Sequence, residues 1–355
     1  MEKVNVAIVG CGNVAGKYAE QIQDYKQVNL AGFTDLDEER ARKFGEEYGG
    51  RVYPSLQDVL SDPTINVVVN LTIHHAHYEV ITQCLNGGKH VHSEKPLALS
   101  CTETQKLVAL AREKNLRLSS APTNFMGEAQ QTAWKVLREG RLGKVRLAYA
   151  EINHGRIETW HPNPEPFYDV GILWDVSVYP LTYLAALFGR VSRVRAFGTV
   201  IHPHRRTLKG GSFHIETPDC VFAIIEFDCG LFARLTANFY AKTSKERHSI
   251  ELHGDKGSLY LGNFQRFDCA VEYAEYGEVY EPVPYLKTPF EGHEVARGVE
   301  EFADAILQNR PHRATGERAA HIIEIVEAIG NAVKSGESIP IQSDYTPPEP
   351  MDWAL

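Results

Sequence analysis

The tripeptide Glu94-Lys95-Pro96 ends a short apolar run at residues 88–93, and its lysine is the strongest candidate for chemistry in this chain. Proline fixes its own φ and pushes the residue before it out of the helical region, so we expect Lys95 to be held extended at a strand end. A lysine held there can bind a reacting oxygen and stabilise developing negative charge. A solvated surface lysine is the alternative, and a cis Lys95–Pro96 bond is not decided by the sequence.

A second motif makes the catalytic interpretation the stronger one. An apolar stretch at residues 4–9 leads into Gly10-x-Gly12-x-x-Ala15 and then into helix-forming residues. Gly10 permits a tight turn, Gly12 lets the backbone approach a pyrophosphate, and Ala15 allows a helix to lie close to the strand. The phosphates would bind the unpaired N–H groups at the helix N-terminus. The pattern predicts a dinucleotide-binding turn made by Gly10, Gly12, Asn13, Val14 and Ala15.

Asp35 bears on which dinucleotide binds. It ends a second apolar stretch at residues 28–34, about twenty residues beyond the glycine turn, where a ribose-binding acid is expected. Its carboxylate would repel the 2′-phosphate of NADP by on the order of 4 kcal/mol at about 4 Å and an effective dielectric of about 20. NAD is therefore favoured, although Arg40 could offset the repulsion and leaves NADP open. The alternative is that Asp35 only caps the helix that starts near Asp37.

The composition is that of a soluble protein with two domains. The chain has 355 residues, which exceeds what one hydrophobic core usually supports. Its net charge of −9 argues against nucleic acid or an anionic membrane as the main partner. We see no apolar run of membrane-spanning length and no signal segment, so we expect a cytoplasmic protein without a membrane partner. Six scattered cysteines without a Cys-x-x-Cys pair favour reduced thiols.

The hydrophobic pattern divides the chain into an N-terminal domain at residues 1–121 and a C-terminal domain at residues 122–355. The first alternates strand and helix and predicts a Rossmann-type, doubly wound parallel sheet. Its expected strands are 4–9, 28–34, 66–71, 90–93 and 116–120, and its expected helices are 14–25, 37–47, 77–87 and 101–114.

The second domain begins with an amphipathic helix at 127–138 and continues with longer alternating strands. These predict an open, mostly antiparallel sheet with one face uncovered. The expected strands are 145–154, 191–201, 219–227, 231–240, 247–253 and 257–261, and two helices at 292–308 and 315–334 close the chain.

Together the glycine turn, the Glu94-Lys95-Pro96 segment and a later segment around Asp175 resemble the Gfo/Idh/MocA family, named for glucose-fructose oxidoreductase, inositol dehydrogenase and rhizopine catabolism. The resemblance covers nearly the whole chain. It implies a Rossmann domain followed by a domain built on an open sheet. It also implies hydride transfer between NAD(P) and a sugar, inositol or related polyol.

The third family segment is represented here by residues 171–180 and resembles the pattern Asp-x-Gly-x-His. Ser177 stands where glycine is usual, and Tyr179 stands where many members have histidine. Similarity to glucose-fructose oxidoreductase implies that Tyr179 is the acid/base residue, with Lys95 on the same oxygen and Asp175 orienting the substrate or Tyr179. Asp175 and Tyr179 would share a helix face. Pro180 disfavours a helical Tyr179 unless a helix is just beginning there.

A histidine-rich segment follows the expected strand at 66–71. The family pattern Thr-Pro-Asn-x-x-His maps onto Thr72 and His77, with Ile73 and His74 replacing the proline and asparagine. We expect Thr72, His74, His77 and Glu94 to lie near the cofactor. A zinc site would need a further converging ligand, so no metal is expected.

Candidate substrate residues lie after the strands of the second domain. The loop at 154–164 contains His154, Trp160 and His161, and the last two suit a sugar face and its hydroxyl groups. Asn124 and Phe125 follow the expected strand 116–120 and would also line the cleft. Packing of the loop is the alternative for these side chains.

Two other functions stay open. Some relatives of the family cleave glycosidic bonds by transient oxidation with tightly held NAD, and a non-catalytic nucleotide or sugar sensor would keep the same fold. The joint presence of Lys95, Asp175 and Tyr179 argues against a pure sensor. We also expect a homodimer or homotetramer assembled through the open sheet face.

Overall fold

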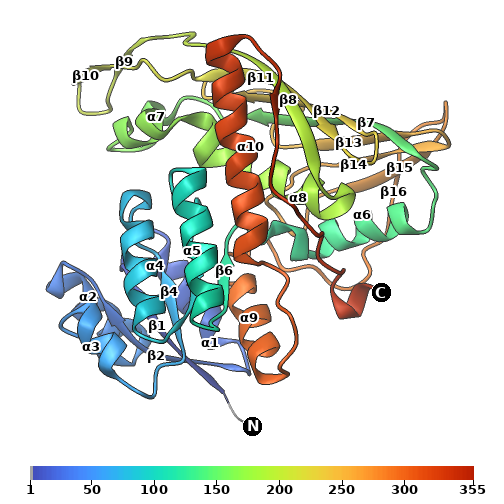
Figure 1. Cartoon of the computed structure of the whole chain (residues 1–355). Helices are drawn as coiled ribbons and strands as arrows, with labels where there is room; N and C mark the ends of the chain where they lie inside the picture. Colours follow the sequence, from blue (N-terminus) through green and yellow to red (C-terminus); the bar gives the residue numbers. More distant parts are fainter. Residues whose placement is uncertain (1–2) are drawn as a thin grey trace. The chain divides into compact units, whose positions relative to one another are not determined.

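The computed structural model describes residues 3–355, and these form two compact units (Figure 1). Unit 1 contains the chain up to Thr123 and also Glu294–Ile323, whereas unit 2 contains Asn124–His293 and Glu324–Leu355. The predicted boundary after residue 121 lies close to the first crossing. The return of residues 294–323 to the first unit was not anticipated from the sequence.

Unit 1 is built on a six-stranded parallel sheet in the order β3-β2-β1-β4-β5-β6. The order reverses between β1 and β4, and this switch point is where doubly wound sheets bind their ligands. The strands are β1 (Val4–Val9), β2 (Val28–Thr34), β3 (Arg51–Val52), β4 (Val67–Asn70), β5 (His90–Ser93) and β6 (Leu118–Ser120).

Helices cover both faces of this sheet because alternate residues of its central strands enter two separate cores. Val6 and Ile8 of β1 pack with α1, α2 and α9, whereas Ala7 and Val9 pack with α3, α4 and α5. Side chains cap several of these helices, as Ser100 does for α5. The helices are α1 (Ala15–Gln23), α2 (Glu38–Tyr48), α3 (Leu56–Ser61), α4 (His77–Asn86), α5 (Cys101–Glu113) and α9 (Arg297–Leu307).

Unit 2 contains a nine-stranded sheet in the order β16-β15-β14-β13-β7-β12-β11-β8-β17, with a separate β9–β10 hairpin. All its neighbours are antiparallel except β7 and β12, which are parallel. The strands are β7 (Val145–Asn153), β8 (Val191–Thr199), β9 (His204–Arg206), β10 (Ser212–His214), β11 (Cys220–Phe227), β12 (Phe232–Asn238), β13 (Ile250–Gly254), β14 (Gly257–Leu261), β15 (Val271–Glu275), β16 (Glu281–Pro282) and β17 (Ile339–Pro340).

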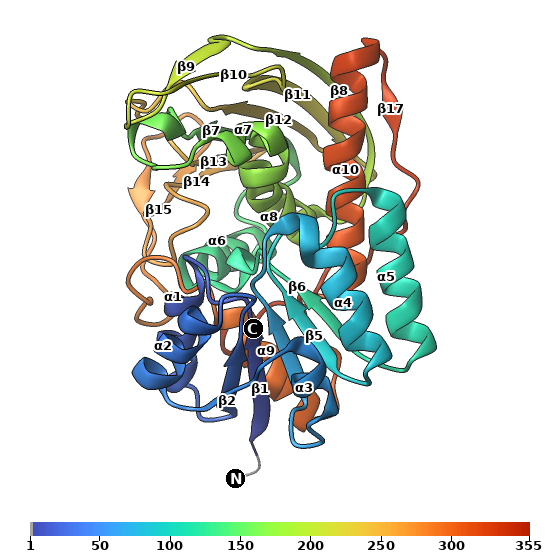
Figure 2. The same cartoon turned by 90° about the vertical axis from the view of Figure 1, so that its left-hand side faces the viewer.

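One face of this large sheet is covered by helices. Figure 2 shows α6 (Glu128–Arg138) and α8 (Val178–Phe188) beneath the strands, and α7 (Glu165–Ile172) precedes α8 in the chain. Along β11, Val221, Ala223 and Ile225 are buried on the covered face, whereas Phe222 and Ile224 are 50% and 45% exposed. The alternation of apolar and polar residues thus corresponds to a sheet with one buried and one open face, as predicted. The last helix, α10 (Gly316–Ser335), starts in unit 1 and ends in unit 2.

The expectation that no apolar run reaches membrane-spanning length is wrong for the helical stretch Glu165–Phe188. This stretch is long and apolar enough to pass for a membrane span. However, 67% of its most apolar window is buried, and Gly171 interrupts the helix with a φ of 83°. A core helix of a folded domain passes the same test, so this stretch is weak support for a membrane crossing.

Candidate functional site

The glycine turn after β1 has the geometry of a phosphate-binding loop. Gly10 has a φ of 95°, and a Cβ there would lie 2.8 Å from backbone atoms of Leu71 and Thr72. Only glycine fits at this point. A Cβ at Gly12 would meet nothing within 4 Å, so the backbone there faces open space. Asn13 is exposed, and Val14 precedes α1 without any side-chain cap. The N–H groups at the start of α1 are therefore suited to an anion.

Asp35 is held against this turn at the end of β2. Its Oδ2 accepts a 2.7 Å hydrogen bond from the Cys11 N–H, and its Oδ1 accepts one of 2.8 Å from the Asp37 N–H. Arg40 Nη1 lies 3.4 Å from the carboxylate. Asp37, not Asp35, caps α2, so the capping alternative for Asp35 is wrong. Burial raises the pKa of the Cys11 thiol to about 12, and Asp35 adds to this shift, so the thiol stays protonated.

Lys95 directly follows Glu94, whose side chain connects the end of β5 to α1, the helix after the glycine turn. Glu94 Oε1 accepts a 2.8 Å hydrogen bond from the Tyr18 hydroxyl on α1, and Glu94 Oε2 accepts one of 3.0 Å from the Lys95 N–H. The Lys95–Pro96 peptide bond is cis. Glu94 and Lys95 are both partly exposed. The Lys95 backbone is thus anchored beside the glycine turn, within unit 1.

His77 closes a second set of contacts around the same segment. It is the first residue of α4 and is buried, with Nδ1 2.6 Å from the Pro96 carbonyl oxygen and Nε2 3.0 Å from that of Thr72. Burial lowers the pKa of His77, although the two carbonyls act in the opposite direction. Thr72 in turn donates from Oγ1 to Asn70 Oδ1 at 2.8 Å. His77 therefore ties the loop after β4 to the segment that carries Lys95.

His74 lies three residues before His77, in the loop after β4. It starts a single 3₁₀ turn, His74–Ala76, and is partly buried. Its ring centroid lies 4.7 Å from that of His75. In residues 3–355 no group of three or more His, Cys, Asp or Glu side chains is arranged to hold a metal ion.

In unit 2, Asp175 and Tyr179 lie at an irregular join between helices. Asp175 belongs to a π-helix, Leu173–Ser177, and Tyr179 is the second residue of α8. Pro180 lacks an N–H, and its ring would press on the carbonyl four residues earlier, which accounts for a widened turn just before it. The predicted condition, a helix just beginning at Tyr179, is not met: helical backbone runs on from the π-helix through Ser177 into α8, and Tyr179 is helical because the widened turn accommodates Pro180. Single π turns inside helices are frequent at functional sites.

Asn124 lies against Tyr179. Its Nδ2 donates to the carbonyl oxygens of Tyr179, at 3.3 Å, and Phe264, at 2.8 Å. Its Oδ1 is buried and has no hydrogen-bond partner in the part of the chain that the structure describes. An orphaned buried acceptor is rare and marks a place where a ligand or water can donate. Phe125, the other candidate from this segment, is fully buried.

The remaining candidates gather around a stack of rings. His154 is stacked on His248, with centroids 5.4 Å apart and planes at 22°, and contacts Phe239 and Trp160 edge-on at 5.7 and 6.3 Å. Trp160 is 47% exposed, which leaves much of its ring for a ligand. His161 is partly exposed, and its Nδ1 accepts from the Asn163 N–H at 3.1 Å. The loop predicted to contain substrate residues thus forms an aromatic and imidazole surface.

Two residues of this region were missed in the sequence. His248 joins the ring stack, and burial lowers its pKa to about 3, with His154 and Arg247 acting in the same direction. His293 places its ring 5.9 Å from that of Tyr179. Both are single histidines in segments without a motif. The only sequence signal was the position of His248 at the start of an expected strand.

Comparison with known proteins agrees with this arrangement. Residues 4–121 match the family described as the oxidoreductase family with an NAD-binding Rossmann fold, and residues 130–260 match the GFO/IDH/MocA C-terminal domain. The chain belongs to the Gfo/Idh/MocA family. The predicted family and fold class are therefore confirmed.

Its relatives in the Gfo/Idh/MocA family are distant. An uncharacterized oxidoreductase of Schizosaccharomyces pombe is 33% identical over 41% of this chain and 40% of its own length. The trans-1,2-dihydrobenzene-1,2-diol dehydrogenase of Macaca fuscata fuscata is 26% identical over 72% of this chain and 73% of its own. A solved levoglucosan dehydrogenase, in complex with NADH and L-sorbose, has the same fold with a TM-score of 0.85 at 19% identity, covering 97% of this chain and 100% of its own.

The residues of unit 1 fit the NAD of this oxidoreductase family. Gly12 leaves space for a pyrophosphate, the start of α1 is free of a side-chain cap, and Asp35 presents a carboxylate at the end of β2. NAD is thus the cofactor of the chain, as predicted.

Proposed function

We propose that this oxidoreductase transfers a hydride between NAD and a hydroxyl-bearing carbon of a sugar, inositol or related polyol. The observation that carries the proposal is the anchoring of Lys95. Glu94 ties its segment to α1, and His77 ties it to the loop after β4, so a cation follows the strand end beside a dinucleotide-binding turn. A sensor that only binds nucleotide has no need of a lysine held in this way.

The proposed chemistry divides three roles among the chain's own residues. Tyr179 exchanges a proton with the reacting hydroxyl group, Lys95 hydrogen-bonds the same oxygen and stabilises the charge that develops on it, and Asp175 orients the substrate or Tyr179. NAD supplies the hydride acceptor or donor when it is bound. Since an ordinary phenol has a pKa near ~10, the positive charge of Lys95 would favour the phenolate that proton transfer requires.

The substrate class is supported by the surface around His154 and by the named relatives. Exposed Trp160 offers an apolar face for a sugar ring, and Asn124 Oδ1 offers a buried acceptor for a hydroxyl group. The macaque relative is named for a diol, and the solved levoglucosan dehydrogenase binds L-sorbose. All of these are small polyhydroxylated or dihydroxylated molecules, so we expect the same chemical class here.

The test is a screen of polyols, aldoses and glycosides for a change in NADH absorbance, with products followed by chromatography. We expect at least one polyol or aldose to be oxidised with an equal amount of NADH formed. Cleavage of a glycoside without net NADH would instead indicate the redox-assisted glycosidase. Binding of sugar without any product would indicate the sensor.

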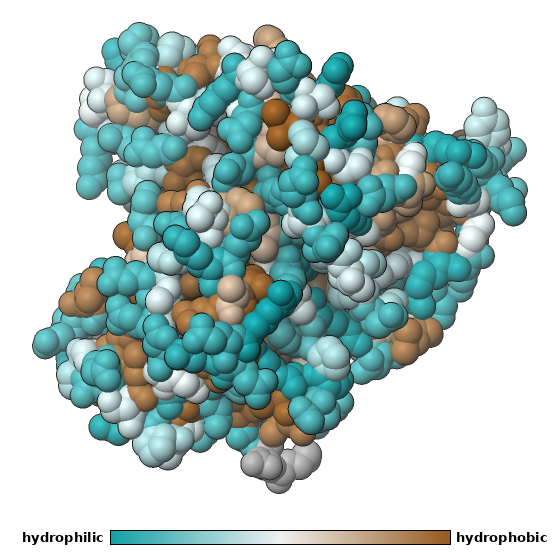
Figure 3. Space-filling model, viewed as in Figure 1, coloured by the Kyte–Doolittle hydropathy of each residue, from teal (hydrophilic) through white to brown (hydrophobic). Residues whose placement is uncertain are grey.

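We further propose that the open sheet face assembles two or four copies of the chain. Five side chains on this face are between 42% and 71% exposed: Leu147, Phe197, Phe222, Ile224 and Phe232. Leu147 is paired in register with Phe232, and Phe197 with Phe222, whereas Ile224 lies opposite Arg195 and Arg234. Figure 3 shows brown hydrophobic residues mixed with teal hydrophilic ones on the side of the chain that is also seen in Figure 1. Exposed apolar side chains on one face favour contact with another protein. We expect that partner to be the same face of a second copy of the chain.

The prediction for assembly concerns Phe222. Phe222→Glu would bury a carboxylate in such an interface, so the mass by light scattering should fall from that of a dimer or tetramer toward that of the monomer. Tyr276→Glu, at an 82% exposed position away from these five residues, is the control. An unchanged mass in Phe222→Glu would exclude this face as the interface.

A further inference from the structure

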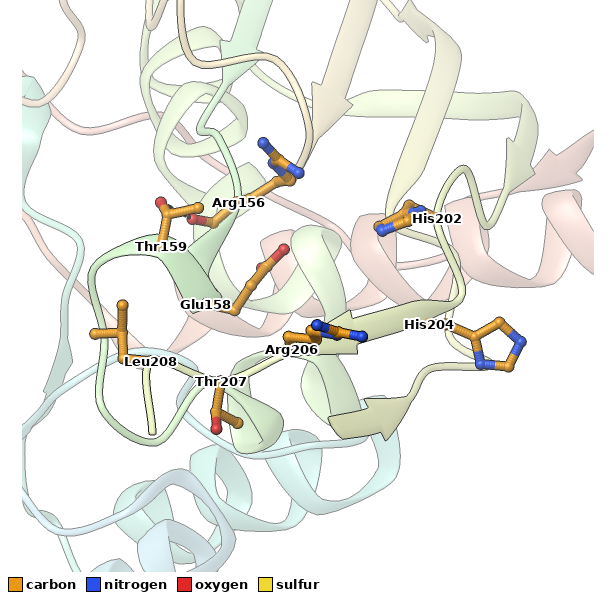
Figure 4. A pocket seen from close by; sticks show the side chains of 8 residues that line it. All are labelled: Arg156, Glu158, Thr159, His202, His204, Arg206, Thr207 and Leu208. Atoms are coloured by element: carbon orange, nitrogen blue, oxygen red, sulfur yellow. Dashed lines mark hydrogen bonds between the residues drawn. The ribbon is translucent and has the colours of Figure 1, made fainter. Parts of the chain in front are cut away.

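A cavity of about 610 Å³ lies in unit 2 between the loop after β7 and the β9–β10 hairpin (Figure 4). Its volume falls within the range typical of small-molecule sites. Arg156 and Thr159 line it from the loop, and His202, His204, Arg206 and Thr207 line it from the hairpin and the segment before it. The walls thus contain two guanidinium groups, two imidazoles and two hydroxyl groups.

The one carboxylate in the wall, that of Glu158, belongs to a buried cluster of charged side chains. Glu158 accepts a 2.9 Å hydrogen bond from Arg205 Nη1 and also bonds the Tyr168 hydroxyl. Arg205 is fully buried and pairs with Asp219 through its other terminal nitrogen. These buried ion pairs hold the floor of the cavity in shape. One guanidinium against two carboxylates leaves this cluster with one net negative charge, which the two positive charges of Arg156 and Arg206 outnumber.

Arg156 and Arg206 have no such partner. Neither forms an ion pair with a carboxylate anywhere in residues 3–355. Arg156 only approaches the ring of Tyr240, at 5.8 Å from its centroid. Two unpaired guanidinium groups that border one cavity, beside hydroxyl groups and imidazoles that can donate hydrogen bonds, form a binding surface for an anion.

The cavity adjoins the proposed substrate residues through its own loop. Arg156 follows His154 by two residues, and Thr159 directly precedes Trp160. The parallel strands β7 and β12 both end at this edge of the sheet, where Asn153 is paired in register with Asn238. The sheet therefore brings the ring stack and the cationic cavity to the same edge of unit 2.

We propose that this cavity binds an anionic group, a carboxylate or a phosphate, on the substrate. The inference rests on the proposed function, and it narrows the substrate to an acidic or phosphorylated sugar or polyol. His154 and Trp160 contact the neutral sugar ring, while Arg156 and Arg206 bind its anionic end. No covalent step occurs in this cavity.

Three probes of related structure test the proposal: glucose, glucuronate and glucose 6-phosphate. Their binding to the full chain is measured by titration calorimetry, and NADH formation is measured in parallel. We expect glucuronate or glucose 6-phosphate to bind roughly tenfold or more tightly than glucose, since charge-assisted hydrogen bonds are the stronger ones. Whichever of the two binds more tightly shows whether the cavity prefers a carboxylate or a phosphate.

The double variant Arg156→Gln/Arg206→Gln should lose that preference and keep its affinity for glucose. Lys209→Gln, at an exposed position of the same hairpin that does not line the cavity, removes a positive charge outside the cavity; it is the control and should keep the preference. Equal affinity for all three probes, or an unchanged preference in the double variant, would overturn the proposal. Calorimetry does not depend on turnover, so binding of the anion without NADH formation would contradict the proposed function alone.

Discussion

The two units hold their candidate site residues by different means. In unit 1, hydrogen bonds hold Asp35, Glu94 and His77, and most of them have a backbone partner. In unit 2, the side chains of His154, Trp160 and Tyr179 contact other rings: His154 contacts His248 and Trp160, and Tyr179 contacts His293. Backbone partners exist whatever the neighbouring side chains are, whereas a ring stack changes with each substitution. This difference is consistent with a cofactor that is common to the family on unit 1 and a substrate that varies among its members on unit 2.

The largest expected effect tests the division of roles between the units. Tyr179→Phe removes the proposed proton carrier of unit 2, so kcat should fall by about a thousandfold. Lys95→Met in unit 1 removes only charge stabilisation, so we expect a loss of about a hundredfold. Steady-state kinetics on the identified substrate measure both, with NAD affinity as the control. Near wild-type turnover of Tyr179→Phe would make Lys95 the preferred proton donor.

The second prediction concerns the cofactor contact of unit 1. Asp35→Ser removes the carboxylate that would repel a 2′-phosphate, so the preference for NAD over NADP should fall on the order of a hundredfold. The measurement is kcat/KM for each cofactor at fixed substrate. An unchanged ratio would show that Asp35 does not face the ribose, and Asp37→Ser serves as a control at the helix cap.

A third, smaller effect is expected from the clamp at His77. His77→Phe keeps the ring volume but removes the N–H that a neutral imidazole donates to one of the carbonyls of Thr72 and Pro96, so the free energy of unfolding should fall by about 1–3 kcal/mol. We also expect kcat to fall by about tenfold because the segment of Lys95 loosens. His77→Gln can still donate one hydrogen bond and should recover part of kcat. If both variants lose stability but keep kcat, the clamp does not position Lys95.

The smallest effect is a pH dependence of stability in unit 2. His248 has a folded pKa of about 3, below the ordinary value near ~6.5, because it is buried. Below pH ~6.5 the unfolded chain gains a proton that the folded chain does not, so stability falls as the pH falls. This contribution is about 2 kcal/mol at pH ~5.

In the variant His248→Phe, the contribution of His248 to the pH dependence of stability should be absent. Urea unfolding at pH 7.5 and pH 5 gives the difference, and the loss of stability on acidification should be about 2 kcal/mol smaller than in the wild type. An equal loss in both proteins would mean that His248 is protonated in the folded state.

The sheet of unit 1 and most of the helices of its N-terminal part could be predicted because their signals are local, whereas the return of residues 294–323 to this unit could not. A β-branched run such as Val67–Asn70 forms a strand wherever it is buried on both faces, and Gly10 is required by one close approach to Leu71. The short strand Arg51–Val52 and helix Leu56–Ser61 were missed, since each is too brief for a periodic pattern. Among the candidate site residues of unit 1, the glycine turn, Asp35, Lys95 and His77 were all proposed from the sequence.

Unit 2 was less predictable because its features depend on distant partners. Nothing in β7 and β12 alone indicates that they pair in parallel, and the β9–β10 hairpin lies outside the expected strands. The π-helix before Tyr179 follows from the packing around Pro180 and not from residue preference. His248 and His293 were missed for the same reason, since single histidines carry no spacing signal.

The sequence by itself determined the family, the Rossmann sheet, the glycine turn and the position of Lys95 at a strand end, because each depends on residues close together in the chain. Only the tertiary structure decided which rings surround His154, which carbonyls His77 joins, and that Arg156 and Arg206 border one cavity. Several of these contacts join segments far apart in the chain, as those of His154 with His248 and of Arg156 with Arg206 do. Their partners are selected by sheet register and by the burial of polar groups, which no local pattern encodes.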